Sequence, residues 1–170
     1  MSHDLHSGEA QVSQFPVAPR LQRGIAALGF VSPRPIQAQT IPAALAGRDI
    51  LGLAQTGTGK TAAFALPILE RLHNVHKPGP RALILAPTRE LAIQIHAEIE
   101  ALARFTDIKA ITIFGGVSAA PQIRNLRARP DILVACPGRL LDLMQQGFVK
   151  LGTVEVVVLD EADHMFDMGF

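Results

Sequence analysis

Three acidic residues follow a short apolar run in the stretch VVVLDEAD near the end of the sequence. The run is Val156–Leu159, and the carboxylates belong to Asp160, Glu161 and Asp163. Carboxylates at a strand end can hold Mg²⁺ through its waters, and a neighbouring carboxylate can orient or deprotonate a water molecule. The alternative is a solvated acidic turn after a strand. The acids alone do not decide between these two interpretations.

A glycine-rich stretch, AQTGTGKT at 54–61, offers a second kind of chemistry. Gly57 and Gly59 can adopt backbone angles that other residues resist, so the chain can turn sharply there. Successive N–H groups in such a turn, at the start of a helix, form a nest for anions. Lys60 adds a positive charge for the β- and γ-phosphates, and Thr61 offers a hydroxyl to Mg²⁺. Although Ala54 stands where the strict motif has glycine, the pattern predicts a phosphate-binding loop rather than a plain glycine-rich turn.

The predicted phosphate loop favours the metal-site interpretation of Asp160 and Glu161 over a solvated acidic turn. Such a loop needs a partner for its metal at a neighbouring strand end, and Asp160 ends an apolar run as that partner does. We therefore expect Asp160 to hold Mg²⁺ largely through water, because Mg²⁺ keeps several waters and takes few carboxylates. Glu161 is then placed to orient or deprotonate the attacking water.

These residues need strands and helices to position them, and the sequence alternates the two. Each expected strand is short and apolar at nearly every position, as in parallel sheets covered on both faces. The expected strands are Asp49–Ala54, Ala82–Pro87, Ala110–Gly115, Asp131–Pro137 and Glu155–Asp160. The alternation predicts an α/β domain with a predominantly parallel sheet, helices on both faces and right-handed crossovers. Ligands of such sheets bind at the carboxyl ends of the strands.

Two of the expected helices have clear starts. Thr88 is placed as the N-cap of a helix whose apolar stripe consists of Leu91, Ile95, Ile99 and Leu102. Pro137 and Gly138 open another helix, which Gly147 ends. Residues 1–14 are polar and aperiodic, so we expect a flexible arm there and one folded domain over 15–170.

Composition limits the possible partners. The formal net charge is +1, from 16 Lys and Arg against 15 Asp and Glu, so bulk charge does not attract polyanions. A single cysteine, Cys136, excludes a disulfide framework, and no apolar run reaches the roughly 18 residues that a membrane span needs. The composition predicts a cytoplasmic protein with no membrane partner. With no Trp or Tyr, base-stacking platforms are scarce, so any nucleic-acid contact should be to the backbone.

Taken together, the motifs resemble those of the DEAD-box ATP-dependent RNA helicases. The stretches AQTGTGKT and VVVLDEAD occur with GFVSPRPIQ, PTRELA, a Gly-Gly pair, CPGR and DMGF, in the order in which the family has them. The resemblance covers nearly everything from about residue 15 to residue 170. It implies a RecA-like P-loop domain that uses ATP and Mg²⁺ and acts on RNA with little base specificity.

The resemblance also implies a role for each residue that matches a family motif. Gln37 recognises the adenine edge, and Asp163 links the ATP site to the cleft between two RecA-like domains. Lys60, Asp160 and Glu161 are the catalytic residues, and Thr61 and Asp160 hold the metal. The nucleotide-binding loop consists of Ala54, Gln55, Thr56, Gly57, Thr58, Gly59, Lys60 and Thr61. The RNA backbone is expected against Pro87, Thr88, Arg89, Gly115, Gly116, Gly138 and Arg139, although taken singly such arginines are often solvated surface and such Gly-Gly pairs are turns.

The sequence departs from the family at three positions. The aromatic residue that stacks on adenine is replaced by Val12, so either Phe15 serves from a shifted loop or the stacking is lost. Cys136 replaces a threonine, and we expect a packed structural thiol. His164 follows the acids, and we expect it to be exposed or interdomain rather than catalytic.

The resemblance also implies that this chain is a fragment. In the family the first domain continues with a further helix, a strand and a Ser-Ala-Thr block, and a second RecA-like domain supplies arginines to the phosphate site. We therefore expect the chain to bind nucleotide and to hydrolyse it barely. Two alternatives are a nucleotide-dependent RNA-binding or adaptor module without turnover, and another P-loop enzyme such as a nucleotide kinase or GTPase. The second lacks support, since no Asn-Lys-x-Asp block that specifies guanine is present.

Overall fold

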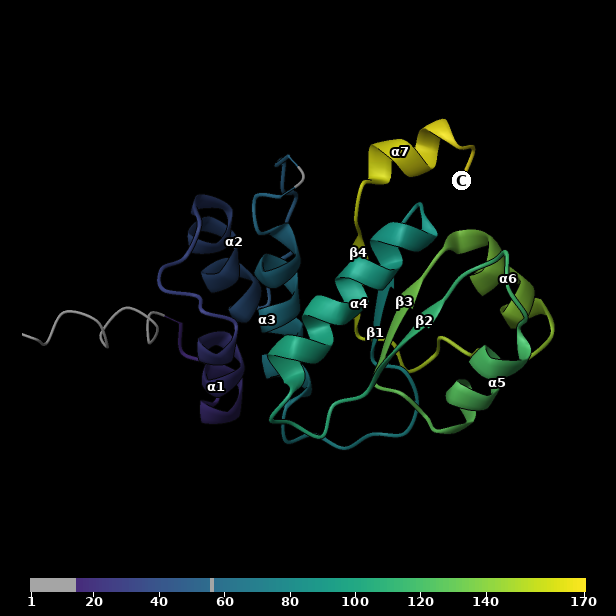
Figure 1. Ribbon diagram of the computed structural model, residues 1–170, viewed down its shortest axis with the longest axis horizontal. Helices are drawn as coiled ribbons and strands as arrows, with labels where there is room; N and C mark the ends of the chain where they lie inside the picture. The colour runs from purple at the N-terminus through teal and green to yellow at the C-terminus, as the bar shows by residue number, and fades with distance from the viewer. Residues whose placement is uncertain (1–14, 56) are drawn as a thin grey trace, which may run out of the picture. The chain divides into compact units, whose positions relative to one another are not determined.

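The computed structural model describes residues 15–55 and 57–170 (Figure 1). The expected arm over 1–14, with Val12, and the loop residue Thr56 lie outside the described residues. The chain divides into two compact units. The first contains Met1–His73 and Ala101–Thr106, and the second contains Asn74–Glu100 and Asp107–Phe170.

The first unit is helical. It contains α1 (Pro19–Ala27), α2 (Pro35–Leu45) and α3 (Lys60–Leu72), with fully buried Leu21, Ile41 and Leu69 in its interior. A glycine allows α1 to approach the chain closely at 101–106. A Cβ on Gly24 would lie 2.1 Å from the carbonyl oxygen of Leu102, so no larger residue fits there without a backbone shift.

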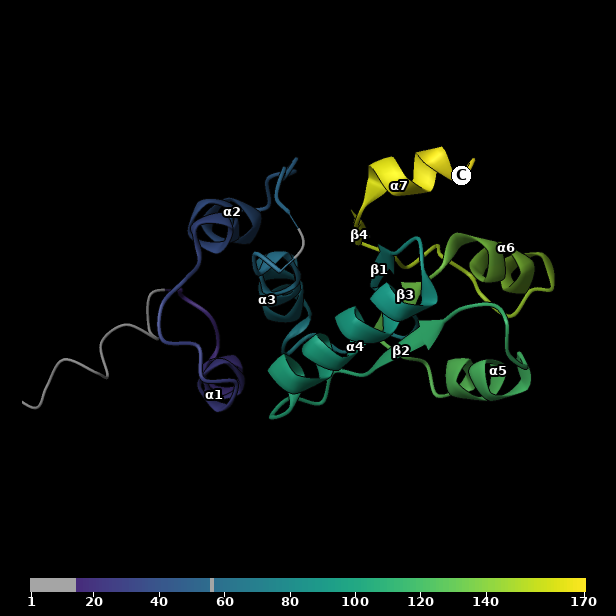
Figure 2. The ribbon, with the colours of Figure 1, turned by 45° about the horizontal axis from the view of Figure 1, so that its top comes forward.

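The second unit is an α/β layer structure, seen from two sides in Figures 1 and 2. Its strands are β1 (Ala82–Leu85), β2 (Ala110–Ile113), β3 (Ile132–Ala135) and β4 (Val156–Leu159). Its helices are α4 (Arg89–Ala103, whose last residues count with the first unit), α5 (Ala120–Arg127), α6 (Pro137–Gln145) and α7 (Ala162–Asp167). The strands pair in the order β2-β3-β1-β4, and every pairing is parallel. This arrangement confirms the predicted α/β class.

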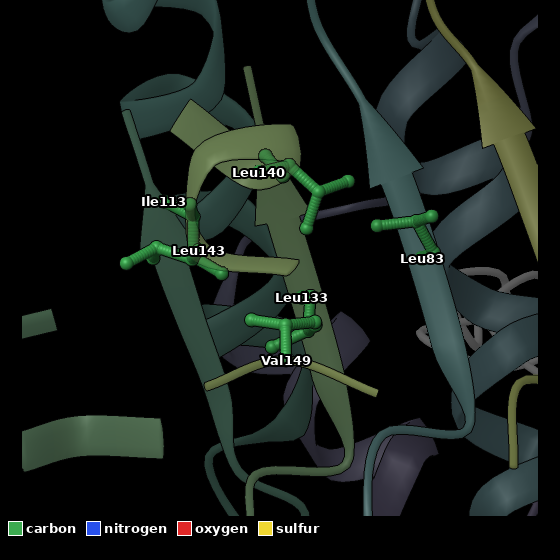
Figure 3. Close-up of a cluster of buried hydrophobic side chains, with 7 residues drawn as sticks. Leu83, Ile113, Leu133, Leu140, Leu143 and Val149 are labelled. Carbon is green, nitrogen blue, oxygen red and sulfur yellow. The ribbon is translucent and has the colours of Figure 1, made fainter. Parts of the chain in front are cut away.

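The core of the second unit lies between the sheet and α6 (Figure 3). Its buried members are Leu83, Ile113, Leu133, Ala135, Leu140, Leu143 and Val149. They come from three neighbouring strands, from α6 and from the segment that follows α6. Figures 1 and 2 place α5 and α6 on one side of the sheet and α4 on the other. Each of these helices follows one of three parallel strands in the chain, so the helices start near the same edge of the sheet, at the carboxyl ends of the strands.

The helix starts follow the sequence signals. The Leu91 N–H donates to Thr88 Oγ1 at 3.2 Å, which confirms Thr88 as the cap of α4. The stripe of α4 faces inward, with Ile95, Ile99 and Leu102 buried. Pro137 is the first residue of α6, as predicted, and the helix gives way to Gly147 at φ 79°.

Two predictions about strands were wrong. Asp49–Ala54 is irregular, and Leu51 and Leu53 are each 91% exposed. A strand needs a hydrogen-bonded neighbour, and this segment has none among the described residues, so its apolar pattern does not suffice. The second error concerns β4, which was expected to be covered on both faces. Val157 and Leu159 are exposed on this edge strand, which pairs with β1 alone in the described part of the chain.

Candidate nucleotide and RNA site

The phosphate loop lies in the first unit, immediately before α3. Gly57 and Gly59 have left-handed φ values of 78° and 88°, which glycine adopts more readily than other residues. Lys60 and Thr61 are the first two residues of α3. Thr58 Oγ1 donates to the Gln55 carbonyl at 2.6 Å and closes the turn. A turn of this kind at a helix start can present N–H groups to an anion. The described segment before the turn is not a strand.

Gln37 holds this loop from α2. Its side chain is 2% exposed, and Nε2 donates to the Gly59 carbonyl at 3.1 Å. Its Oε1 accepts the backbone N–H of Arg34 at 3.0 Å. The two bonds fix which atom is oxygen and which is nitrogen, because a carbonyl must face a donor and an N–H must face an acceptor. Gln37 is thus oriented for hydrogen bonding before any ligand arrives.

Arg34 makes a second contact with the loop that the sequence did not predict. Its Nη1 donates to the Gly57 carbonyl at 2.5 Å. The carbonyls of Gly57 and Gly59 are therefore both bonded to side chains from the start of α2. Arg34 lies three residues before Gln37, at the N-cap of α2.

An apolar cavity of about 30 Å³ adjoins Gln37 in the same unit. Its lining consists of Phe15, Ile25, Phe30, Val31, Ser32, Pro33, Gln37, Ala62 and Leu66. Phe15 therefore lies near the residue that is expected to recognise adenine.

The acidic motif lies in the second unit, at the carboxyl end of β4. Asp160 is 8% exposed, and its backbone N–H continues the sheet by donating to the Leu85 carbonyl at 3.0 Å. Its Oδ1 accepts the Glu161 N–H at 3.1 Å. Glu161 has a left-handed φ of 52°, unusual for a residue with a Cβ, and such backbone strain is concentrated at functional sites. Asp163, in the first turn of α7, is exposed.

His164 has a neighbour that the sequence did not predict. Its side chain is exposed, in agreement with the expectation, but Nδ1 lies 3.5 Å from Glu161 Oε2. The ring therefore stands beside the carboxylate that is expected to handle water. Glu161 is the N-cap of α7 and His164 lies three residues further on. This i, i+3 spacing is the sequence signal from which the contact could have been predicted.

The expected RNA-contacting segments also lie in the second unit, at the carboxyl ends of β1, β2 and β3. Arg89 is the first residue of α4 and is exposed, and its guanidinium lies 4.9 Å from the centre of the Phe114 ring. Thr88 is half-buried and its hydroxyl is used as the helix cap. Pro87 is buried, so it offers RNA no side chain.

The glycines of these segments are open to solvent. Gly115, Gly116 and Gly138 have no atom within 4 Å of where a Cβ would stand, so a phosphate can approach their backbone. Arg139 is only 14% exposed, and its Nη2 donates to the Val117 carbonyl at 2.9 Å. Its Nη1 is buried and has no hydrogen-bond partner among the described residues. Its Nε lies 3.7 Å from Asp142 Oδ2. The guanidinium is thus held by α6 and by the Val117 backbone.

Cys136 is the N-cap of α6, between these segments. Burial raises the pKa of its thiol, and the negative charge of Glu90 raises it further. A high pKa keeps the thiol protonated and unreactive. This agrees with the expected packed structural residue.

The oxygen ligands that Mg²⁺ prefers are present in both units. Thr61 lies in the first turn of α3, and Asp160 ends β4 with its carboxylate largely shielded from solvent. Among the described residues no group of three or more His, Cys, Asp or Glu is arranged to hold a metal. Mg²⁺ bound with phosphates does not need such a group, because it takes one or two carboxylates and keeps its waters. Thr61 and Asp160 each offer an oxygen donor of the kind that this ion prefers.

The chain resembles named helicases over most of its length. It is 49% identical to the ATP-dependent RNA helicase RhlB of Pseudomonas syringae pv. tomato over 96% of this chain and 43% of that protein. It is 49% identical to the ATP-dependent RNA helicase DRS1 of Pyricularia oryzae over 98% of this chain and 22% of that protein. The chain thus spans less than half the length of these relatives.

Solved structures agree in fold. A DEAD box protein from Methanococcus jannaschii superposes with a TM-score of 0.85 and 40% identity over 92% of this chain and 42% of that chain. A hypothetical ATP-dependent RNA helicase from Sulfolobus tokodaii superposes with a TM-score of 0.81 and 42% identity over 89% of this chain and 43% of that chain. The family model of the DEAD/DEAH box helicases matches residues 34–170. The chain belongs to the DEAD/DEAH box helicase family.

Proposed function

We propose that this chain is the ATP-binding part of an ATP-dependent RNA helicase, which couples ATP binding and hydrolysis to RNA unwinding or remodelling. The observation that carries the proposal is the phosphate loop, whose Gly57 and Gly59 carbonyls are bonded to Arg34 and Gln37. Carbonyls held in this way leave the loop N–H groups for an anion. Gln37 keeps a second N–H and a second oxygen lone pair, which suit the donor and acceptor edge of adenine.

Each unit contributes its own groups to the reaction. In the first unit, the loop 54–61 holds the phosphates, and Lys60 stabilises the charge that develops on them. In the second unit, Glu161 orients or deprotonates the attacking water. Thr61 and Asp160 are each proposed as an oxygen ligand for Mg²⁺, Asp160 largely through water, and the ion would supply positive charge to the phosphates.

The RNA backbone binds along the carboxyl ends of β1, β2 and β3. Arg89 and Arg139 supply guanidinium groups beside helix starts, where the helix dipole also favours anions. The open backbone at Gly115, Gly116 and Gly138 admits phosphates closely. Thr88 and Pro87 act through the backbone that they position at the start of α4. Asp163, exposed on α7, is proposed to couple the ATP site to a second RecA-like domain.

The relatives named above have more than half of their length outside the part that matches this chain. We therefore propose that the 170-residue chain binds nucleotide and RNA but turns ATP over slowly by itself. We also propose a cytoplasmic location, and no helix among the described residues is long and apolar enough to cross a membrane.

The test is an ATPase assay on a longer helicase that carries this chain, with and without single-stranded RNA. We expect RNA to stimulate phosphate release, and Lys60→Ala to remove both the basal and the stimulated rate. Binding of ATP and RNA without stimulated hydrolysis would refute the helicase proposal and favour the adaptor module.

A further inference from the structure

Gln122 is a polar residue that is only 7% exposed, on α5 of the second unit. Both polar atoms of its side chain bond to a single residue. Nε2 donates to the Phe114 carbonyl at 2.9 Å, and Oε1 accepts the Phe114 N–H at 3.2 Å. A side chain that exchanges two hydrogen bonds with one backbone position imitates a paired residue of a neighbouring strand.

Phe114 directly follows the last residue of β2, Ile113, and precedes the Gly115–Gly116 pair. The carboxamide of Gln122 therefore prolongs the pairing of β2 by one residue, up to the glycines. Gly116 has a φ of 76°, and both glycines are exposed. Glycine backbone loses more conformational freedom on ordering than any other, so a fixed anchor next to the pair reduces the entropy that a ligand must remove.

Two arginines contact the same short segment, Phe114–Val117. The Arg89 guanidinium lies over the Phe114 ring, and Arg139 Nη2 donates to the Val117 carbonyl. These arginines come from the starts of α4 and α6. Both guanidinium groups therefore contact this segment, and the hydrogen bonds of Gln122 hold its first residue, Phe114.

The packing of α5 does not require an amide at this position. Ile123 and Leu126 of α5 and Ala119 before it pack against the buried cluster of the second unit. These residues hold the helix on the sheet, whereas both hydrogen bonds of Gln122 go to the loop backbone. An apolar side chain of the same length would fill the space and leave the loop untethered.

We propose that Gln122 is a positioning residue for RNA-backbone binding, which holds the Gly115–Gly116 turn and the two arginines in one arrangement. The proposal rests on the proposed RNA-binding function of this surface. It extends that surface to Gln122, which touches no RNA itself.

The test uses Gln122→Met in the 170-residue chain, because methionine has nearly the same length and makes neither hydrogen bond. Gln146→Met is the matched control, since Gln146 is the exposed C-cap residue of α6 and its side chain donates to Asp142. Binding of a fluorescently labelled single-stranded RNA is measured by anisotropy at several salt concentrations, and binding of ADP with Mg²⁺ is measured by calorimetry.

We expect Gln122→Met to weaken RNA binding roughly fivefold or more, the factor that corresponds to one lost hydrogen bond. The slope of log affinity against log salt should fall as phosphate contacts are lost. ADP affinity should stay within error of wild type, whereas the thermal midpoint should fall modestly because Phe114 loses two hydrogen bonds. Gln146→Met should match wild type in RNA and ADP binding. The amide resonances of Gly115 and Gly116 should shift or broaden in Gln122→Met alone.

Three results would overturn the proposal, and they differ from one another. If Arg139→Ala weakens RNA binding and Gln122→Met does not, the RNA-binding surface stands and the role of Gln122 is refuted. Equal losses of RNA and ADP affinity in Gln122→Met would show a general folding role. If the wild-type chain binds no RNA, the proposed RNA surface fails and the role of Gln122 fails with it.

Discussion

Alanine substitutions at Gly57 and Gly59 form a matched pair. They test whether the position of Gln37 beside Gly59 determines the preference for adenine over guanine. Both glycines have a left-handed φ, so alanine strains the loop at either position. Only at Gly59 does the added Cβ meet other residues, at 2.6 Å from Gln37 Nε2 and 2.9 Å from Arg34 Cδ. At Gly57 it meets no atom of the described residues within 4 Å. Gly59→Ala should displace Gln37, and Gly57→Ala should not.

The expected magnitudes follow from the contacts. Left-handed backbone costs an alanine about 1–2 kcal/mol, so this strain should weaken the binding of ADP and of GDP roughly tenfold in both variants, and ADP binding should fall further in Gly59→Ala as Gln37 is displaced. The two hydrogen bonds that Gln37 can make to an adenine edge are worth about 1 kcal/mol each, or roughly a thirtyfold preference for ADP over GDP. Gly57→Ala should keep that ratio. Gly59→Ala should lower it toward one, because Gln37 cannot hold its position against a Cβ at 2.6 Å.

The assay is a calorimetric titration of wild type and both variants with ADP and with GDP, each with Mg²⁺. Circular dichroism and thermal melts establish that the variants fold. An unchanged ratio in Gly59→Ala would refute the reasoning, since Gln37 would then not govern base preference from its place against Gly59. A wild-type ratio near one would mean that the loop is formed without a working adenine pocket.

Three further predictions concern other positions. Lys60→Ala should abolish ADP binding by calorimetry with an unchanged melting profile, since it removes the charge that pairs with the phosphates. Phe15→Ala should weaken ADP binding and leave pyrophosphate binding unchanged if Phe15 supplies the aromatic face near Gln37; equal ADP affinity would mean that stacking is lost. Burial and Glu90 raise the pKa of Cys136, so thiol labelling should be slower than for a free cysteine at each pH, and Glu90→Gln should shift the labelling profile to lower pH. Because the fold favours the neutral thiol, the stability that this group contributes is present below the ordinary thiol pKa and is lost as pH rises above it.

The sequence predicted β1, β2, β3 and β4 and the helix starts that carry their own signals. The pattern is clearest for β1 and β3, the interior strands of the sheet, where nearly every position is buried. Thr88 was identifiable because capping depends on a local hydrogen bond. Local chemistry of this kind can be read along the chain.

The errors arose where structure depends on a partner. Asp49–Ala54 has the composition of a buried strand, but backbone pairing is what makes a strand, and composition does not reveal whether a neighbour is present. Gln122 and Arg34 were missed for a related reason. Gln122 donates to the Phe114 carbonyl, and Arg34 donates to the Gly57 carbonyl. No pattern of residue types in the sequence indicates which backbone carbonyl a side chain will bond.

Gln37 shows how a residue identified for one role can have two. The sequence connected Gln37 with adenine, whereas its amide atoms bond to the backbone of Arg34 and Gly59. Loss of the side chain therefore removes a tether of the phosphate loop as well as a base contact. We expect Gln37→Ala to weaken binding of pyrophosphate with Mg²⁺, a ligand without a base, by about fivefold, the effect of one hydrogen bond. ADP binding should fall further, by the base contacts in addition. Pyrophosphate affinity equal to that of wild type would show that the bond to Gly59 does not order the loop, and Gln37 would then act on the base alone.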